Sequence, residues 1–263
     1  MSADGPVGVF DSGVGGLSVL RAVRYELPAE HLIYVGDSGC APYGDRSAAF
    51  VTDRATTIAQ FLVEQGAKAM VVACNTATAI AVEALRARFT MPIVAIEPAV
   101  KPAAARTQSR IVGVLATTGT LSSQNMEKLL ANHGDVQFLI QPCPGLADQV
   151  EKGELASNET RSMVKRYVRP LIDEGADILV LGCTHYPFLS PLIQEIAGPG
   201  VDIVDPATAV ARELRRRLES ARLVFDSTAP GTERFWTTGR VDDSAAIVGQ
   251  LWGTHVQLQR LQR

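Results

Sequence analysis

The residues best suited to chemistry are two of the four cysteines in the chain. Cys74 (VVACNTAT) and Cys183 (LVLGCTHYP) each follow an apolar run of strand character, and each opens toward a helix or turn. Because a helix N-terminus lowers the pKa of a thiol, both positions favour a reactive thiolate. Cys40 and Cys143 stand in loop or strand-end contexts without a partner motif, so we expect small buried hydrophobic residues there.

Two thiols that face each other across one cleft suit the inversion of a stereocentre. That reaction needs one base to remove a proton from one face of a carbon and one acid to deliver a proton to the other. His185 is a proton partner for Cys183, and Asp11 is one for Cys74. The rival interpretation is a zinc site formed by Cys74, Cys183 and His185, although the spacing is not that of a structural zinc site and no CxxC pair is present.

A substrate of this site needs groups that hold its charges. Backbone N–H groups at helix starts and side-chain hydroxyls can bind carboxylates without charged side chains. An acidic side chain, Asp11 or Glu151, can meet an ammonium group. Some of the hydroxyls could instead serve only as helix N-caps. The candidate hydroxyls belong to Ser12, Thr76, Thr117, Thr118 and Thr184.

The glycine-rich run from Asp11 to Gly16 first suggests a nucleotide loop. The dinucleotide fingerprint requires Gly or Ala where Ser18 stands, and Asp11 would repel a pyrophosphate. No lysine follows the glycines, which excludes a Walker A loop. The run therefore indicates tight packing between a strand and a helix, with Asp11 and Ser12 free to point into a cleft.

Short apolar runs alternate with helical patterns along most of the chain, which predicts parallel sheets covered by helices. Glycine follows several helices where a C-cap is expected. The second set of strands resembles the first at an offset of 105 to 109 residues. The expected strands are 7–10, 32–35, 69–73 and 93–96, then 111–115, 136–140, 178–181 and 202–204; the main helices are 17–27, 54–65, 77–89, 123–133 and 158–174.

This pattern predicts an α/β fold of two similar, pseudo-symmetric domains, each with a doubly wound parallel sheet. Ligands of such sheets bind beyond the carboxyl ends of the strands, so the active site is expected in the cleft between the domains. The segment 98–110 looks like an interdomain crossing. Residues after 206 exceed what the second repeat needs, so they are expected to return to the first. The predicted domains are 1–97 plus 208–263, and 98–207.

Composition excludes several classes of protein. The net charge of −3 and a pI near 5.8, without a basic block, argue against nucleic acid as a direct ligand. No apolar run approaches the roughly 18 residues of a membrane helix, and the start lacks a signal-peptide pattern, so a cytoplasmic protein is expected. Four cysteines in 263 residues do not form a disulfide framework.

Seven motifs, in order along nearly the whole chain, resemble those of bacterial glutamate racemases: FDSGVGGLSVL, GDSGCAPYG, VVACNTATA, IVAIEPAV, VGVLATTGT, LGCTHYP and FWTTG. The resemblance implies a racemase that needs no cofactor and no metal and supplies D-glutamate for peptidoglycan, and hence for the cell wall and cell shape. It also implies a homodimer in the cytoplasm. Some members of the family inhibit DNA gyrase as a second activity.

The resemblance assigns roles to individual residues. Cys74 would act on the face of D-glutamate and Cys183 on that of L-glutamate, with Asp11 and His185 assisting them. Glu151 matches the family's additional acidic residue near the second cysteine. The substrate-binding residues would be Ser12, Tyr43, Gly44, Asn75, Thr76 and Thr184.

Two other functions stay open at this point. One is a racemase for aspartate or another small acidic compound, since a two-cysteine design tolerates different side chains. The other is a binding module, in which the cleft holds an anion or the surface engages a protein without turnover.

Overall fold

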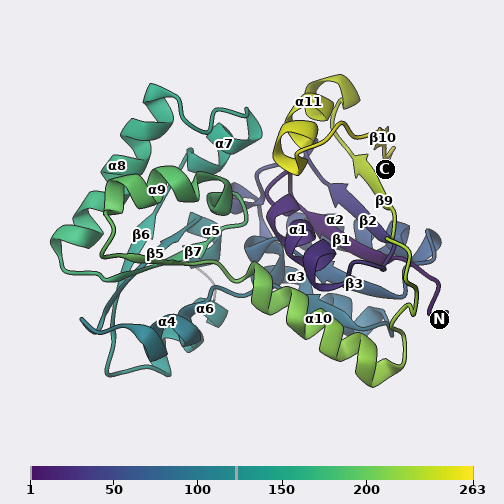
Figure 1. Cartoon of the computed structure of the whole chain (residues 1–263), viewed down its shortest axis with the longest axis horizontal. Coiled ribbons are helices and arrows are strands. Elements are labelled where there is room, and N and C mark those ends of the chain that lie inside the picture. Colours follow the sequence, from purple (N-terminus) through teal and green to yellow (C-terminus); the bar gives the residue numbers. More distant parts are fainter. Residues whose placement is uncertain (1, 122–123, 263) are drawn as a thin grey trace.

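The computed structural model describes residues 2–121 and 124–262. Within these residues the strands form two sheets, and every strand pairing is parallel. Figure 1 shows the two sheets in separate lobes. The first lobe has the order β10-β9-β2-β1-β3-β4, with β1 (Val7–Asp11), β2 (Leu32–Gly36), β3 (Ala69–Val72), β4 (Ile93–Ala95), β9 (Glu233–Thr237) and β10 (Leu258–Arg260). The second has the order β6-β5-β7-β8, with β5 (Ile111–Ala116), β6 (Gln137–Pro142), β7 (Ile178–Gly182) and β8 (Asp202–Val204).

Helices cover both sheets (Figure 1). The first lobe carries α1 (Leu17–Glu26), η1 (Tyr43–Asp45), α2 (Ala48–Glu64), α3 (Asn75–Arg88), α10 (Ala207–Ala221) and α11 (Val241–Trp252). The second carries α4 (Val100–Arg106), α5 (Thr118–Leu121), α6 (Gln124–Ala131), α7 (Leu146–Glu151), α8 (Asn158–Asp173), η2 (Tyr186–Leu189) and α9 (Ser190–Ala197). This architecture confirms the predicted α/β class of two parallel-sheet domains.

The two lobes repeat one topology. The order β2-β1-β3-β4 in the first sheet matches β6-β5-β7-β8 in the second, because both sheets place the second, first, third and fourth strands of their half in the same sequence. The repeat makes β3 equivalent to β7. Cys74 and Cys183 therefore follow equivalent strands, as the offset in the sequence predicts.

The C-terminal segment completes the first lobe. β9 pairs with β2 and β10 pairs with β9, while α10 packs against α1. These pairings support the discontinuous division into 1–97 plus 208–263 and 98–207, which we keep as a proposal for the domain boundaries.

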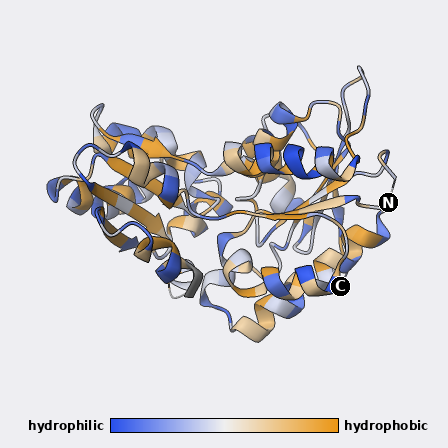
Figure 2. Cartoon of the chain, turned by 90° about the horizontal axis from the view of Figure 1, so that it is seen from below, coloured by the Kyte–Doolittle hydropathy of each residue, from blue (hydrophilic) through white to orange (hydrophobic). Residues whose placement is uncertain are grey.

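Buried apolar side chains join the lobes. One core cluster runs from Val9 and Leu17 of the first lobe to Leu181 and Ile193 of the second. Figure 2 shows the apolar residues gathered along the strands and the inward faces of the helices. Closely packed apolar side chains therefore connect the two lobes and keep the carboxyl ends of their strands close to each other.

Several boundaries differ from the predicted ones. α2 begins at Ala48 rather than at residue 54, because the Ser47 hydroxyl caps the helix by accepting a hydrogen bond from Phe50 N at 3.3 Å. The expected crossing 98–110 contains α4. The predicted helix 123–133 corresponds to α6, and its first residue lies outside the described residues. In the described ranges no helix has the length and apolar character needed to cross a membrane.

Candidate active site

The carboxyl ends of β1, β3 and β7 converge on a small cavity between the lobes. Its volume is about 30 Å³, which is room for about two or three water molecules. A substrate as large as an amino acid therefore requires the lobes or loops to move apart. The lining residues are Ser12, Pro42, Tyr43, Gly44, Cys74, Asn75, Thr76, Thr117, Thr120, Ala147, Cys183, Thr184 and His185.

Cys74 is the N-cap of α3. Its sulfur accepts a hydrogen bond from Ala77 N at 3.4 Å, and its thiol donates to Ser12 Oγ at 3.6 Å. Burial, with the nearby charge of Asp11 as the next cause, nevertheless raises the pKa of Cys74 to about 12. The Ala77 N–H at the helix N-terminus lowers the pKa of Cys74, as expected, but desolvation of the thiolate outweighs it, so the net shift is upward.

Cys183 belongs to a chain of three polar side chains. Its sulfur lies 3.5 Å from His185 Nδ1, and His185 Nε2 lies 2.6 Å from Glu151 Oε1. Burial alone would lower the pKa of His185, but the Cys183 sulfur and the Glu151 carboxylate together raise it well above its usual range. The imidazole is thus held in its protonated form beside Cys183.

Asp11 lies at the junction of the two lobes and is fully buried. Its carboxylate accepts hydrogen bonds from Gly13 N at 2.9 Å and from Thr184 Oγ1 at 3.0 Å. Burial raises its pKa, although the charge of His185 opposes this effect. The sequence predicts Asp11 as a proton partner of Cys74, but among the described residues the hydrogen bonds of its carboxylate come from Gly13 and from Thr184, the residue after Cys183.

The glycines after Asp11 make room for Glu151 and His185 of the second lobe. A Cβ atom on Gly13 would lie 1.8 Å from Glu151 Oε1, and one on Gly15 would lie 2.5 Å from His185 Nδ1. Gly16 fits the predicted packing of strand against helix, since its Cβ would meet Asp11 Cβ at 2.6 Å. Val14 N also donates to Glu151 Oε1 at 2.8 Å, so the loop contacts Glu151 directly.

Threonine hydroxyls line another wall of the cavity. Thr117 Oγ1 lies 3.0 Å from Thr120 Oγ1 and 3.3 Å from Thr76 Oγ1. The sequence analysis missed Thr120, although it stands in the same TTGT segment and its spacing of three residues places it beside Thr117 at the start of α5. Thr118 is exposed and lines a neighbouring outer cavity instead.

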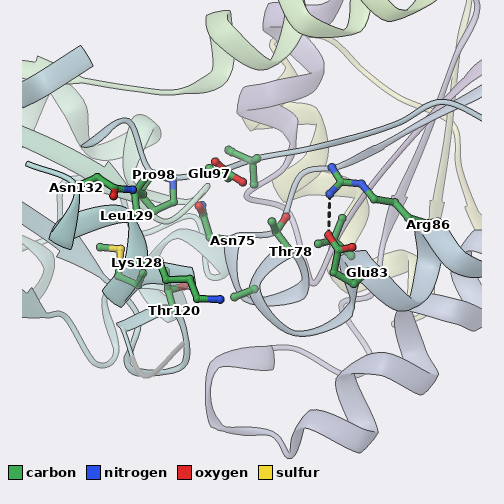
Figure 3. A pocket seen from close by; sticks show the side chains of 14 residues that line it. Asn75, Thr78, Glu83, Arg86, Glu97, Pro98, Thr120, Lys128, Leu129 and Asn132 are labelled. Atoms are coloured by element: carbon green, nitrogen blue, oxygen red, sulfur yellow. Dashed lines mark hydrogen bonds and ion pairs between the residues drawn. The ribbon is translucent and has the colours of Figure 1, made fainter. Parts of the chain in front are cut away.

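Asn75 has a buried amide without a partner. Within the described chain, neither its oxygen nor its nitrogen forms a hydrogen bond. An unsatisfied buried amide is costly, so a water molecule or a ligand must complete it. Asn75 and Thr120 also line a second cavity, of about 270 Å³, between α3 and α6. Figure 3 shows Asn75 in that cavity, with the Glu83–Arg86 ion pair along α3.

Tyr43 and Gly44 reach the cavity through the loop after β2. The Tyr43 hydroxyl donates to Asp37 Oδ2 at 2.5 Å, so its phenol is directed at Asp37. Burial, followed by the Asp37 charge, raises the pKa of Tyr43. Tyr43 and Gly44 thus present ring and backbone atoms to the cavity.

Two further predictions about the cysteines are that Cys40 and Cys143 are buried core residues and, as the rival interpretation, that Cys74 and Cys183 bind zinc. All four cysteines are free. Cys143 is buried, as predicted, and its thiol donates to Gln141 O at 3.3 Å, whereas Cys40 is only half-buried. In the residues that the structure describes, no three His, Cys, Asp or Glu side chains are grouped to hold a metal ion, so the zinc interpretation of Cys74, Cys183 and His185 finds no such group.

Comparisons with known proteins agree on one group. The family model for Asp/Glu/Hydantoin racemase matches residues 7–214. The glutamate racemase of Methylococcus capsulatus is 52% identical over 252 residues, which cover 95% of this chain and 93% of the relative. The crystal structure of glutamate racemase isoform RacE1 from Bacillus anthracis is 34% identical, with a TM-score of 0.89 and coverage of 98% and 97%. That of the Escherichia coli glutamate racemase with L-glutamate and the activator UDP-MurNAc-ala is 32% identical, with a TM-score of 0.86 and 98% coverage of both chains.

Proposed function

The chain belongs to the Asp/Glu/hydantoin racemase family, and we propose that it interconverts L-glutamate and D-glutamate by proton transfer at the α-carbon, without a cofactor. The observation that carries the proposal is the pair Cys74 and Cys183, which follow equivalent strands of the two lobes and line one cavity. A substrate held between them presents one face of its α-carbon to each sulfur.

Each turnover moves one proton from the substrate to one sulfur and one from the other sulfur to the substrate. With L-glutamate, the Cys183 thiolate removes the α-proton and the Cys74 thiol protonates the opposite face, which leaves Cys183 as thiol and Cys74 as thiolate. D-glutamate reacts by the reverse path. The reaction therefore needs one thiol and one thiolate at its start.

The two sulfurs have different surroundings that suit these roles. The raised pKa of Cys74 keeps it protonated and ready to donate. His185, whose pKa is also raised, places a cation 3.5 Å from the Cys183 sulfur. Glu151 orients the imidazole from its other nitrogen, as second-sphere carboxylates do for catalytic histidines. Asp11, Cys74, Glu151, Cys183 and His185 are accordingly the residues that we propose for proton transfer.

The rest of the cavity supplies groups for the charges of glutamate. Hydroxyls of Ser12, Thr76, Thr117 and Thr184, the unpartnered Asn75 amide and the backbone of Tyr43 and Gly44 would bind the two carboxylates. The Asp11 carboxylate would meet the ammonium group. Thr118 is a candidate only for an opened form of the site, because it lies on the outer cavity.

The decisive experiment follows Cα exchange in deuterium oxide. L-glutamate incubated with the reduced protein, without pyridoxal phosphate, should lose its optical rotation while deuterium appears at Cα. L-aspartate in a parallel arm tests the other acidic substrate. A folded, reduced protein that leaves both amino acids without deuterium at Cα would overturn the proposal. Cys74→Ser and Cys183→Ser should each nearly abolish turnover in both directions.

Assembly and cellular role are proposals of the same kind. We infer a homodimer in the cytoplasm that supplies D-glutamate for peptidoglycan, on the strength of the family relationship. Light scattering at assay concentrations tests the dimer, and a monomeric mass would contradict it. The family's second activity, inhibition of DNA gyrase, is tested by a pull-down at concentrations that give racemisation; failure to recover gyrase would argue against it.

A further inference from the structure

Asp37, just after β2, is a buried carboxylate that accepts hydrogen bonds from three side chains. Arg54 of α2 donates through Nε to Oδ2 at 3.0 Å and through Nη2 to Oδ1 at 2.8 Å. The Tyr43 hydroxyl donates to Oδ2 at 2.5 Å, and Thr238 Oγ1 donates to Oδ1 at 2.6 Å. Asp37 itself does not line the substrate cavity, so its effect on the site must pass through these partners.

Thr238 comes from the opposite end of the chain. It follows β9 in the FWTTG motif, 201 residues after Asp37. Its backbone N–H donates to Gly36 O at 3.2 Å, and its hydroxyl oxygen accepts from Gly39 N at 3.1 Å. Thr238 therefore bonds the backbone before and after Asp37, at Gly36 and Gly39, in addition to the Asp37 carboxylate.

The loop that Asp37 anchors is the one that reaches the cavity. Tyr43 is almost fully buried, and Gly44 packs against the second lobe: a Cβ on Gly119 would lie 2.7 Å from Gly44 O. This contact leaves little room for Gly44 to shift independently. The bond from the Tyr43 hydroxyl to Asp37 fixes Tyr43 on the side that faces away from the cavity. Because Gly44 follows Tyr43 in the chain, the same bond constrains the backbone of Gly44.

We propose that Thr238 is a positioning residue for glutamate binding, which acts through Asp37 on Tyr43 and Gly44. The inference rests on the proposed racemase function. Each oxygen of Asp37 accepts one bond from Arg54 and one from a hydroxyl, that of Thr238 at Oδ1 and that of Tyr43 at Oδ2. Without the Thr238 hydroxyl, Oδ1 keeps only the bond from Arg54, so the carboxylate, and with it the Tyr43 hydroxyl, is held less firmly.

The test compares three variants of nearly equal size. Thr238→Val keeps the shape but removes the hydroxyl; since a hydrogen bond to a charged group is involved, KM for both enantiomers should rise roughly tenfold, with kcat changed less than about threefold. Thr238→Ser should restore KM to within about twofold, because it restores the hydroxyl. Thr237→Val is the matched control: among the described residues, the Thr237 hydroxyl accepts a local hydrogen bond, from Gly239 N at 3.0 Å.

Two further measurements separate positioning from a general loss of structure. Tyr43→Phe should raise KM as Thr238→Val does, and the double variant should be little worse than either single one, because both act on one path. Amide hydrogen exchange over residues 43–46, which exclude the Gly39 N–H that Thr238 bonds directly, should accelerate in Thr238→Val but not in Thr237→Val. That readout does not depend on turnover.

The possible results distinguish a failure of the inference about Thr238 from a failure of the proposed racemase function. An unchanged KM and unchanged exchange in Thr238→Val, an equal rise of KM in Thr237→Val, or strictly additive effects of the double variant would each overturn the inference. Absence of racemisation by the unmodified protein would instead overturn the proposed function; the exchange rates of the loop would still decide the role of Thr238.

Discussion

Replacing Gly15 with alanine tests whether the glycine loop makes room for His185, the histidine that we propose for proton transfer. The new Cβ atom would lie 2.5 Å from His185 Nδ1, 2.7 Å from His185 Cε1 and 2.7 Å from Thr184 Oγ1. Ordinary contacts begin at 3.4 Å, so the imidazole and the loop must separate by about 0.9 Å. The contact at risk is the 3.5 Å bond between His185 Nδ1 and the Cys183 sulfur.

A displacement of nearly 1 Å in a catalytic group costs on the order of 10²-fold in rate. We therefore expect kcat/KM of Gly15→Ala to fall by about that factor. L- and D-glutamate have equal free energies, so the loss in kcat/KM must be the same in both directions, while kcat and KM can divide it differently. Progress curves from each enantiomer, followed by circular dichroism, measure both quantities.

Two controls make the result specific. Gly200→Ala adds a Cβ that meets nothing within 4 Å, and it should leave kcat/KM unchanged. In a His185→Asn background the Gly15→Ala change should cost less than in the unmodified protein, because the shorter side chain removes the clash with the imidazole and leaves the one with Thr184 Oγ1. A Gly15→Ala protein with unchanged kcat/KM would refute the claim that the loop positions His185.

Four further predictions concern charge and burial. Glu151→Gln should lower kcat by roughly 10- to 100-fold and lower the pKa of His185, because it removes the carboxylate 2.6 Å from Nε2. Steady-state kinetics measure the first effect and an NMR titration of the imidazole measures the second. A His185 pKa that does not change would contradict the pairing with Glu151. Iodoacetamide should alkylate Cys74 at pH 8 roughly a thousandfold more slowly than an exposed thiol, with a rate that rises through pH 10, since its pKa is about 12 rather than 9.0. The same shift means that the unfolded thiol ionises first, so stability from Cys74 is complete below pH 9.0 and is lost as pH rises toward about 12. Lys68→Met breaks a fully buried ion pair with Glu30 at 2.6 Å and should lower the free energy of unfolding by about 3 to 5 kcal/mol in urea titrations; a loss below about 1 kcal/mol would show that Glu30 finds another partner.

Local pattern was sufficient for most of the fold. Apolar runs such as 178–181 place strands within a residue or two because a parallel sheet is buried on both faces. The pattern failed where an element is short or polar: β10 has three residues, Leu258–Arg260, and is a strand because β9 offers it an edge. α4 contains Pro102 in its first turn, where a helix tolerates proline. In the sequence the same proline favours a linker, so the pattern predicts an interdomain crossing over the segment 98–110.

The candidate site was predictable where one strand end supplies both the position and the chemistry. Cys74, Cys183 and His185 are of this kind. Asp37 and Thr238 are not, because their pairing joins residues far apart in the chain and depends on β9 returning to β2. The raised pKa of Cys74 could not be predicted from the sequence either. A motif predicts the helix N-terminus, which lowers the pKa of the thiol, but it does not predict the extent of burial, which raises that pKa.

The glycine loop explains how a repeated fold acquires a site with two unlike halves. The repeat places both sulfurs after equivalent strands, and symmetry alone would give them equal surroundings. Gly13 and Gly15 of the first lobe admit Glu151 and His185 from the second, which gives Cys183 an imidazole partner, while the N–H of Ala77 and the hydroxyl of Ser12 face Cys74. Since the proposed reaction starts from one thiol and one thiolate, this asymmetry is what the chemistry requires. We therefore include Gly13 and Gly15 in the proposed proton-transfer site, although they carry no proton.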